Sequence, residues 1–161
     1  MLKLIEVNEE NWLAFRRLPV GDAQTEFLDS ALGILARGYV YRSSRARVLG
    51  IANGGTAIGL ALVKDLDEDP ACYDLQQFMI DRRFQGQGYG TRALGLILTE
   101  LEVERKYDRV EVCVKRNDAP ALRVYEKVGF LDTGYIDEDA PDSLNLMYHF
   151  PARPEALAQK P

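Results

Sequence analysis

The most informative segment of this 161-residue chain is Phe78-Met-Ile-Asp-Arg-Arg-Phe-Gln85-Gly86-Gln87-Gly88-Tyr89-Gly90-Thr91. It begins inside an apolar segment, 72–80, and leads into an apolar-periodic run over 92–104. Three glycines fall within five residues between the two. The pattern predicts a strand, a glycine loop and a helix.

The glycine loop has the features of a phosphate-binding site. The first amides of a helix lack intrahelical partners and carry the positive end of the helix dipole, so they bind phosphate oxygens well. Because Gly86, Gly88 and Gly90 lack a Cβ, a diphosphate could approach the backbone closely. We expect its oxygens to contact the N–H groups between Gln87 and Thr91.

Two other phosphate loops do not fit the spacing. A P-loop ends in Gly-Lys-Ser/Thr, whereas this chain has Gly90-Thr91-Arg92. A dinucleotide-binding fingerprint needs a third glycine three positions after the second, where Thr91 stands, and a βαβ half before the loop. The spacing that remains is Gln85-x-x-Gly88-x-Gly90.

This hexamer resembles the acetyl-CoA loop of the GNAT superfamily of N-acetyltransferases, Gln/Arg-x-x-Gly-x-Gly/Ala. A second segment, Asn117-Asp-Ala-Pro-Ala-Leu-Arg-Val-Tyr125-Glu-Lys-Val-Gly129-Phe130, resembles the family's Asn-x-x-Ala-x-x-Leu-Tyr-Glu-Lys-x-Gly-Phe. The resemblance implies that acetyl-CoA is the cofactor. The implied cofactor-binding residues are Phe78, Ile80, Gln85, Gly86, Gln87, Gly88, Tyr89, Gly90, Thr91 and Asn117.

The second segment predicts a short helix. Asp118 is a suitable N-cap, Pro120 fits the first turn, and Gly129 suits a left-handed stop. One position departs from the family. Its asparagine usually stands seven residues before the tyrosine, where this chain has Asp118, and Asn117 lies one position earlier.

The resemblance also implies a role for Tyr125. In the family this tyrosine faces the thioester and protonates the departing thiolate. A phenol, with an ordinary pKa of about 10, is protonated at neutral pH, as a general acid must be. The structural alternative is an aromatic residue that packs beside Val124 and Phe130.

In this family the strand before the loop and the strand after the long helix splay apart, and the pantetheine arm inserts between them. Phe78 and Ile80 would then supply backbone contacts to the arm. Their backbone groups would also help to hold the thioester carbonyl, as in an oxyanion hole.

The proton acceptor is harder to assign from the sequence. An alkyl amine, with a pKa of about 10.4, must lose a proton to attack. Period two places four residues on one face of the strand before the loop: Asp74, Gln76, Phe78 and Ile80. Gln76 cannot act as a base, so Asp74 is the candidate, acting through a water, and Glu111 competes from the next strand. The single histidine, His149, is expected to be structural or solvent-facing.

A third resemblance concerns the acceptor of the acetyl group. It lies in the segment Gln24-Thr-Glu26-Phe27-Leu28-Asp29-Ser30, which is followed by Tyr39-Val-Tyr41. It is similar to the Gln-x-x-aromatic-aliphatic-acid-Ser stretch of bacterial spermine/spermidine acetyltransferases. This implies a small-molecule amine as substrate, a polyamine, with Glu26, Phe27 and Asp29 at the acceptor site. The acidic run 137–142 would also attract cations, although a chain rich in acids has acidic loops in any case.

Composition narrows the function further. The 47% hydrophobic and 28% charged residues are typical of a globular protein, and we expect one domain over 1–150 and a flexible tail over 151–161. No apolar run approaches the roughly 20 residues of a membrane span, and the N-terminus lacks a signal-peptide core, so we expect a cytoplasmic protein. The net charge of −5 argues against nucleic-acid binding. Two cysteines and one histidine show no metal-ligand spacing, so no metal is expected.

The predicted elements give an α/β fold. Strands are expected at 2–7, 47–52, 56–63, 72–80, 109–114, 130–136 and 143–150. Helices are expected at 12–18, at 22–37 with Gly38 as the stop, at 92–104, and between Asp118 and Gly129. Asn53-Gly54-Gly55 predicts a tight hairpin. This order is the one expected of the GNAT fold, a single domain with a mixed, mostly antiparallel, splayed sheet flanked by helices.

Other functions stay open at this point. The acceptor could be a peptide or protein N-terminus or an aminoglycoside. The chain could also be a CoA-binding module without catalysis, which Asp118 and the missing obvious base favour, or a purely structural interaction protein. The intact glycine loop and Tyr125 favour an enzyme. The closing strands could pair edge to edge in a homodimer.

Overall fold

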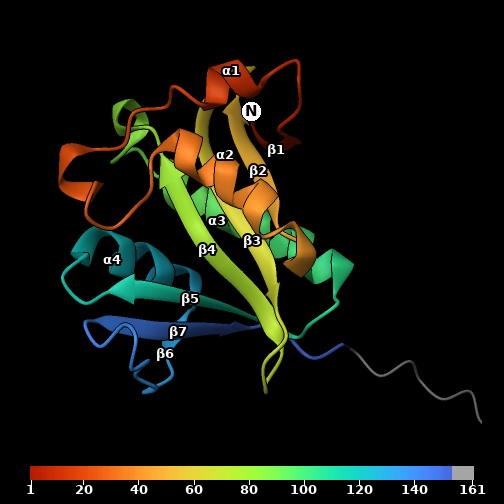
Figure 1. The fold of residues 1–161 in the computed structure, drawn as a ribbon, viewed down its shortest axis with the longest axis vertical. Coiled ribbons are helices and arrows are strands. Elements are labelled where there is room, and N and C mark those ends of the chain that lie inside the picture. Colours follow the sequence, from red (N-terminus) through yellow and green to blue (C-terminus); the bar gives the residue numbers. More distant parts are fainter. Residues whose placement is uncertain (154–161) are drawn as a thin grey trace, which may run out of the picture.

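The computed structural model describes residues 1–153, so most of the tail expected at 151–161 lies outside the described residues. Its seven-stranded sheet has the order β1-β2-β3-β4-β5-β7-β6 (Figure 1). The strands are β1 Leu2–Glu6, β2 Arg47–Asn53, β3 Thr56–Leu66, β4 Cys72–Ile80, β5 Arg109–Lys115, β6 Leu131–Asp132 and β7 Ser143–His149. The helices are α1 Trp12–Phe15, α2 Ala31–Val40, α3 Tyr89–Glu104 and α4 Ala119–Val128, with 3-10 turns η1 Asp22–Gln24, η2 Arg42–Ser44 and η3 Arg82–Phe84.

The sheet is mixed, as predicted. Only β4 and β5 pair in parallel, and every other strand pair of the described sheet is antiparallel. Within residues 1–153, no helix combines the length and the apolar composition needed to cross a bilayer. The predicted α/β class with helices on the sheet is confirmed.

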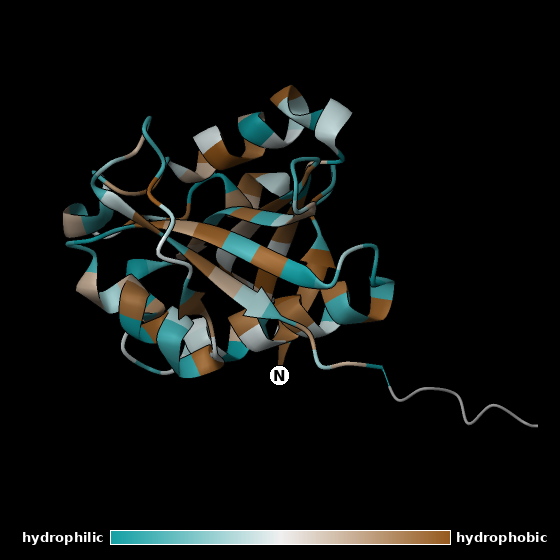
Figure 2. Cartoon of the chain, turned by 90° about the horizontal axis from the view of Figure 1, so that it is seen from below, coloured by the Kyte–Doolittle hydropathy of each residue, from teal (hydrophilic) through white to brown (hydrophobic). Residues whose placement is uncertain are grey.

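Helices cover the sheet on two faces (Figure 2). On one face α1 and α2 pack over β3 and β4, through Phe15, Leu18, Ala31, Ile34, Leu60, Leu62 and Met79. On the other face α3 and α4 pack over β3, β4, β5 and β7, through Ala61, Val63, Tyr73, Leu75, Leu94, Ile97, Leu101, Val110, Val112, Tyr125 and Leu146. Along β3 the core residues alternate between the two faces, as the pleat of a strand requires.

The β2–β3 hairpin matches its sequence signal. Asn53 pairs with Thr56, which leaves a two-residue turn. Gly54 and Gly55 have φ of 56° and 86°, values that favour glycine and that a type I′ turn requires at both positions.

The second predicted helix was wrong in extent. Residues 22–30 form η1 and turns, and α2 begins at Ala31 because the Ser30 hydroxyl accepts a hydrogen bond from the Gly33 amide. Gly38 does not stop the helix, which continues to Val40. A Cβ at Gly38 would lie 2.6 Å from Cγ2 of Val48, so this glycine lets α2 approach β2 closely.

The closing strand predicted over 130–136 is also shorter than expected. β6 pairs with β7 only at Leu131 and Asp132. The Thr133 amide and hydroxyl both donate to the Asn145 carbonyl, and Gly134, with φ of 73°, then turns the chain away from β7. Residues 133–142 therefore form a loop over the edge of the sheet.

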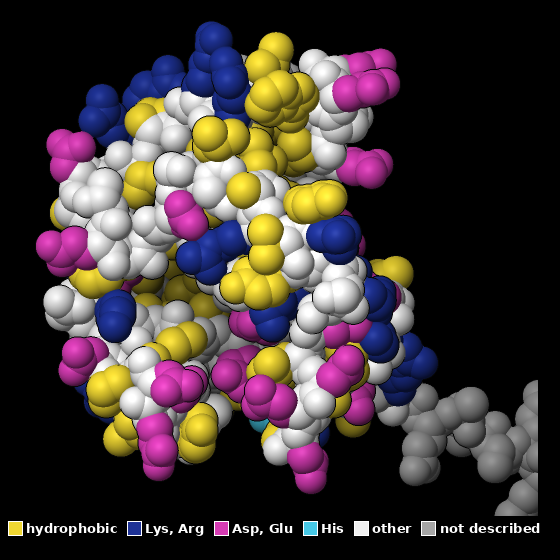
Figure 3. Space-filling view, viewed as in Figure 1, with side chains coloured by type: hydrophobic (Ala, Val, Ile, Leu, Met, Phe, Trp, Pro, Cys, Tyr) yellow, Lys and Arg dark blue, Asp and Glu magenta, His cyan; other side chains and the backbone are white. Residues whose placement is uncertain are grey.

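The parting of β4 from β5 positions the site. The two strands pair at only two positions, Tyr73↔Val110 and Asp74↔Glu111. Just beyond, Leu75 and Gln77 of β4 pair with consecutive residues of β3, so Gln76 is an extra residue in a bulge. Bulges bend a strand and increase its twist. β4 and β5 therefore diverge toward the glycine loop (Figure 1), and the surface is hollowed between the two halves of the molecule (Figure 3).

Two helical glycines give a matched test of the packing. Gly95 lies inside α3, and a Cβ there would meet nothing within 4 Å. Gly95→Ala should raise the free energy of unfolding by about 0.5–1 kcal/mol, because alanine favours helix. Gly38→Ala should lower it by about 1–3 kcal/mol, because its Cβ would overlap Val48. Urea denaturation measures both, and stabilisation by Gly38→Ala would contradict the close packing of α2.

Candidate active site

The glycine loop joins β4 to α3 as predicted. Gly86 and Gly88 have φ of 72° and 78°, in the left-handed region that favours glycine. Gly88 is the N-cap of α3 and has no side chain to cap the helix. The first bond of the helix ladder runs from the Arg92 amide to the Gly88 carbonyl, at 3.2 Å. The amides of residues 89–91 therefore have no intrahelical partner.

The space beside these amides is open. A Cβ at Gly86 or Gly88 would meet nothing within 4 Å. A Cβ at Gly90 would lie at ordinary contact distance, 3.9 Å from Cγ1 of Ile80 and 4.0 Å from Cγ2 of Val124. No contact within the described residues requires a glycine at position 90. This position faces the gap between the end of β4 and α4, where a bulky ligand group needs room.

Two loop glutamines turn their side chains toward the protein. Gln85 Nε2 donates to the Ile80 carbonyl at 2.8 Å and to Gln24 Oε1 at 2.6 Å. Gln87 Nε2 donates to the Arg83 carbonyl at 3.1 Å. These side chains shape the loop, so any contact of Gln85 and Gln87 with a cofactor would come from their backbone.

The free edge of β4 offers backbone groups to the gap. The Asp81 amide donates to the Ile58 carbonyl of β3 at 2.8 Å. Backbone groups alternate along an antiparallel ladder, so those of Phe78 and Ile80 point to the opposite edge, which β5 has left. The Ile80 carbonyl is occupied by Gln85, which leaves its amide and both groups of Phe78 available.

Tyr125 is a residue of α4, and its side chain points toward β4. Its helix begins where the Asp118 carboxylate accepts from the Ala121 amide and ends at Gly129, which has φ of 114°, as the sequence predicted. The Tyr125 ring makes edge contacts with Phe78 and Phe130, at centroid distances of 6.4 and 5.3 Å. Burial raises the pKa of its hydroxyl above the ordinary value, and the charge of Asp118 adds to this. The group therefore stays protonated through neutral pH.

Two neighbouring residues, Asn117 and Asp118, could take the place of the family asparagine. Asp118 is buried and its carboxylate caps α4. Asn117 is exposed in the turn between β5 and α4. Only Asn117 is free to reach a ligand, which favours it as the cofactor contact.

The prediction that Asp74 and Gln76 share a face with Phe78 and Ile80 was wrong. The bulge at Gln76 breaks the two-residue period, which no local pattern in the sequence announced. Phe78 contacts Tyr125 on the α4 face. Asp74 instead pairs at 3.2 Å with Lys64, whose ammonium lies over the Tyr41 ring on the α2 face.

Two carboxylates meet where β4 and β5 part. Asp74 and Glu111 are partners in the last pair of the parallel ladder. Val110 and Val112 belong to the core beneath α3 and α4, so Glu111 points to the opposite face, as Asp74 does. Acidic side chains are numerous in the lower half of Figure 3, the half in which β5 and β7 lie in Figure 1.

The pKa values at this acidic pair are raised. Burial is the main cause for the pKa of Glu111, followed by the charges of Asp74, Glu68 and Asp137. Burial also raises the pKa of Asp74, against the opposing effect of Lys64. Raised carboxyl pKa values are typical of groups that take up protons in catalysis.

The three predicted acceptor residues lie in the segment before α2. Glu26 is exposed and Phe27 is half-buried. Asp29 pairs with Arg37 at 2.9 Å, so its charge is already balanced. The Gln24–Gln85 bond joins residues 61 positions apart, so it carries no local signal that sequence reasoning could have used.

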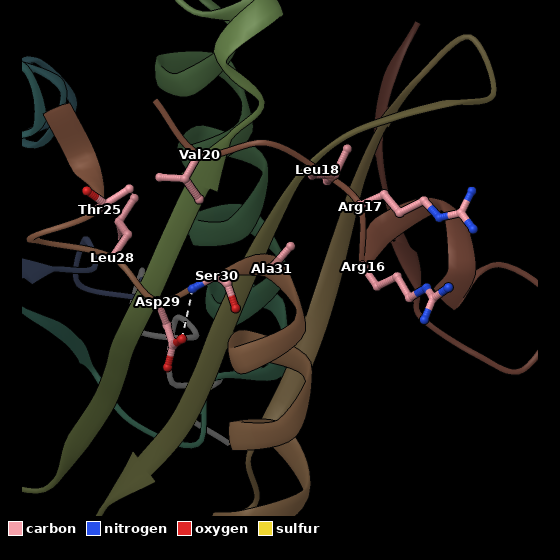
Figure 4. A pocket seen from close by; sticks show the side chains of 9 residues that line it. All are labelled: Arg16, Arg17, Leu18, Val20, Thr25, Leu28, Asp29, Ser30 and Ala31. Atoms are coloured by element: carbon pink, nitrogen blue, oxygen red, sulfur yellow. Dashed lines mark hydrogen bonds between the residues drawn. The ribbon is translucent and has the colours of Figure 1, made fainter. Parts of the chain in front are cut away.

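A pocket of about 470 Å³ lies beside this segment. Its lining residues are Arg16, Arg17, Leu18, Val20, Thr25, Leu28, Asp29, Ser30 and Ala31 (Figure 4). Arg16 and Arg17 point away from Asp29 in this view. The lining includes neither Tyr125 nor the glycine loop, so this pocket lies apart from the gap between β4 and β5.

The half-buried carboxyl of Glu111 predicts a pH-dependent stability. A pKa raised in the folded state means that the folded protein binds this proton more tightly than the unfolded chain. The group therefore favours folding below its unfolded pKa and disfavours it as the pH rises through the folded pKa. Glu111→Gln should be more stable than wild type at pH 7, and the difference should shrink toward about pH 4.

Urea denaturation at both pH values measures this difference. The control is Glu100→Gln, because Glu100 is exposed on α3 and its loss should leave stability nearly unchanged at both pH values. A Glu111→Gln protein less stable than wild type at pH 7 would contradict the burial argument.

Comparisons with known proteins agree with this geometry. The acetyltransferase (GNAT) family matches residues 6–130. A spermine/spermidine N(1)-acetyltransferase from Bacillus subtilis (strain 168) is 27% identical over 136 residues, which cover 81% of this chain and 88% of that protein.

Solved structures share the fold. An aminoglycoside acetyltransferase in complex with coenzyme A has a TM-score of 0.76 at 16% identity, over 92% of this chain and 95% of that one. Spermidine N-acetyltransferase from Vibrio cholerae, in complex with CoA and spermine, has a TM-score of 0.70 at 16% identity, over 92% and 95%. Because the family match spans well over half of the sequence, the chain belongs to the acetyltransferase (GNAT) family.

Proposed function

We propose that this protein transfers the acetyl group of acetyl-CoA to a primary amine of a small polyamine, such as spermidine or spermine, by direct attack in a ternary complex. One observation carries the proposal. The free amides that begin α3, the open edge of β4 and the Tyr125 ring all border the same gap between diverging strands.

Acetyl-CoA supplies the acetyl group and leaves as the free thiol. In the proposed complex the amides of residues 89–91 hold its diphosphate, with the room left at Gly86, Gly88 and Gly90. The backbone groups of Phe78 and the Ile80 amide bind the arm along the edge of β4, and Asn117 contacts it from the turn before α4. The other loop residues, 85, 87, 89 and 91, contribute backbone groups.

The proposed chemistry needs a proton donor and a proton acceptor. Tyr125 gives its proton to the departing sulfur, and its raised pKa keeps that proton available at neutral pH. The Phe78 amide donates a hydrogen bond to the thioester oxygen as the amine attacks. The attacking ammonium loses its proton through water to the carboxylate pair, Asp74 with Glu111, at the junction of the strands.

The amine approaches from the α2 face in this proposal. α3 and α4 cover the other face. Within residues 1–153, α1 and α2 pack over β3 and β4, and no helix packs on the Glu111 side of β5. Glu26 and Phe27 contact the acceptor, and Asp29 shapes the segment through Arg37. The acidic surface suits a substrate with several ammonium groups. A spermine/spermidine acetyltransferase relative at 27% identity supports this class of acceptor.

The cytoplasmic location and the homodimer stay predictions from the sequence, as does the absence of nucleic-acid and membrane partners.

A panel of amines tests the proposed function. Release of CoA thiol is measured with acetyl-CoA and spermidine, spermine, an aminoglycoside or a peptide with a free N-terminus. Saturable turnover of a polyamine above the other amines is expected. Robust turnover of only the peptide or the aminoglycoside would exclude the polyamine, and binding of CoA without turnover of any amine would indicate a non-catalytic module.

Tyr125→Phe tests the proton donor. The substitution keeps the ring contacts with Phe78 and Phe130 and removes only the hydroxyl. We expect kcat to fall by about 10²-fold, while the dissociation constant of CoA changes less than about twofold, within roughly 0.4 kcal/mol. Stopped assays and calorimetry measure the two quantities. Unchanged kcat would remove Tyr125 from the mechanism.

Gly90→Val tests the phosphate loop. The added side chain would enter the gap between Ile80 and Val124, so CoA should bind at least about tenfold more weakly, a change of about 1.4 kcal/mol. Gly95→Val is the matched control, because it makes the same change on the same helix where no atom lies within 4 Å. Equal CoA affinity in both variants would contradict the proposed position of the diphosphate. Thermal denaturation of both variants shows that they are folded.

A further inference from the structure

The segment before α2 contacts the glycine loop directly. Gln85 Nε2 donates to Gln24 Oε1 at 2.6 Å, across 61 positions of sequence. The Arg82 amide donates to the Pro19 carbonyl at 3.1 Å. The Arg82 guanidinium lies 3.7 Å from the Asp22 carboxylate, but both side chains are more than half exposed, so this ion pair is weak. Of the two side-chain links between the segments, the pair of glutamines is therefore the stronger.

Gln24 is a junction in its own segment. Its Oε1 also accepts from the Gly21 amide at 3.3 Å. Its backbone carbonyl accepts from the amides of Phe27 and Leu28, both at 3.0 Å. The turn that places Glu26 and Phe27 is therefore built on Gln24.

Gln85 is a junction on the loop side. One N–H of its amide group donates to the Ile80 carbonyl at the end of β4, and the other donates to Gln24. Gly86, the next residue, begins the part of the loop that leads to the free amides of α3.

The far end of the same segment is attached to the bulge of β4. The Asp29 amide donates to Gln77 Oε1 at 3.1 Å, and Arg37 Nη1 donates to Gln76 Oε1 at 3.4 Å. The segment between Gln24 and Asp29 thus spans from the glycine loop to the strand that borders the gap. Its two attachments hold it along the side from which an amine can enter.

We propose that Gln24 is a positioning residue whose bond to Gln85 couples the cofactor loop to the acceptor segment, so that CoA and the amine each raise the affinity for the other. This inference rests on the proposed function. In this proposal a bound diphosphate orders the glycine loop and with it Gln85. The bond from Gln85 to Gln24 then orders the turn that places Glu26 and Phe27. Coupling of this kind is reciprocal, because each ligand must change the affinity for the other by the same factor.

Gln24→Ala tests the coupling. The variant should bind CoA alone with a dissociation constant within about twofold of wild type, and its kcat at saturating amine should also stay within about twofold. Its KM for spermidine should rise at least about fivefold, the lower end of typical coupling factors. Calorimetry should show that spermidine tightens CoA binding in wild type and does not in the variant.

Two further variants separate positioning from a purely structural role. Gln24→Glu keeps an oxygen that accepts from Gln85 and from the Gly21 amide, so it should restore most of the wild-type KM. Thr25→Ala is the control, because it removes a bond of 2.9 Å between the Thr25 hydroxyl and the Asp22 carbonyl within the same segment and does not touch the loop. It should leave the KM for spermidine nearly unchanged.

The outcomes distinguish the two claims. If wild type turns over no polyamine, the proposed function fails and the coupling fails with it. If wild type acetylates spermidine and Gln24→Ala keeps both its KM and the mutual tightening, only the coupling is overturned. If Gln24→Ala does not fold, two other variants replace it: the single variant Gln85→Ala and the double variant Gln24→Glu with Gln85→Ala. Both should lose the mutual tightening of CoA and spermidine to the same extent. Tightening that survives without Gln85 would overturn the proposal.

Discussion

The shape of the active-site region depends on how unequally β4 pairs with its two neighbouring strands. β4 pairs with β3 along most of its length but with β5 at only two positions, after which the bulge at Gln76 bends it away. Half of the backbone groups beyond that point therefore face a gap instead of a neighbouring strand. The same bend brings the end of β4, the start of α3 and the Tyr125 ring around one opening. A continuous ladder would satisfy the backbone better and would leave no place for an extended ligand.

The two faces of the sheet divide the proposed work. On one face α3 and α4 close the core and present the free amides and Tyr125. On the other face lie α2, the segment before it and the acidic pair of Asp74 and Glu111. Burial raises the pKa of both carboxyls, so each opposes folding at neutral pH. Carboxyl groups that reduce stability in this way are expected where the chemistry needs a proton acceptor, because proteins commonly lose some stability at functional sites.

Much of this arrangement could be predicted from the sequence, because its signals are local. The turn at Gly54 and Gly55, the strand 72–80, the glycine loop and the cap at Asp118 each follow from adjacent residues. The errors have a different origin. Gly38 was interpreted as a helix stop, but the close approach of α2 to Val48 requires it. The sheet face predicted for Asp74 was wrong because a bulge in β4 changes it. A bulge arises from pairing with another strand, so adjacent residues do not reveal it. The Gln24–Gln85 bond joins residues far apart in the chain, so only the folded structure reveals it.

The most direct test of the central claim is the backbone amide NMR spectrum of the protein during titration with CoA and with pantetheine, which lacks the diphosphate. If the first turn of α3 holds the diphosphate, CoA should cause its largest shifts at the amides of Tyr89, Gly90 and Thr91, together with Phe78 and Ile80. Pantetheine should shift only the amides on β4. Saturation by CoA with the amides of α3 unmoved and the main shifts elsewhere, for example around the pocket at Arg16 and Leu28, would contradict the account.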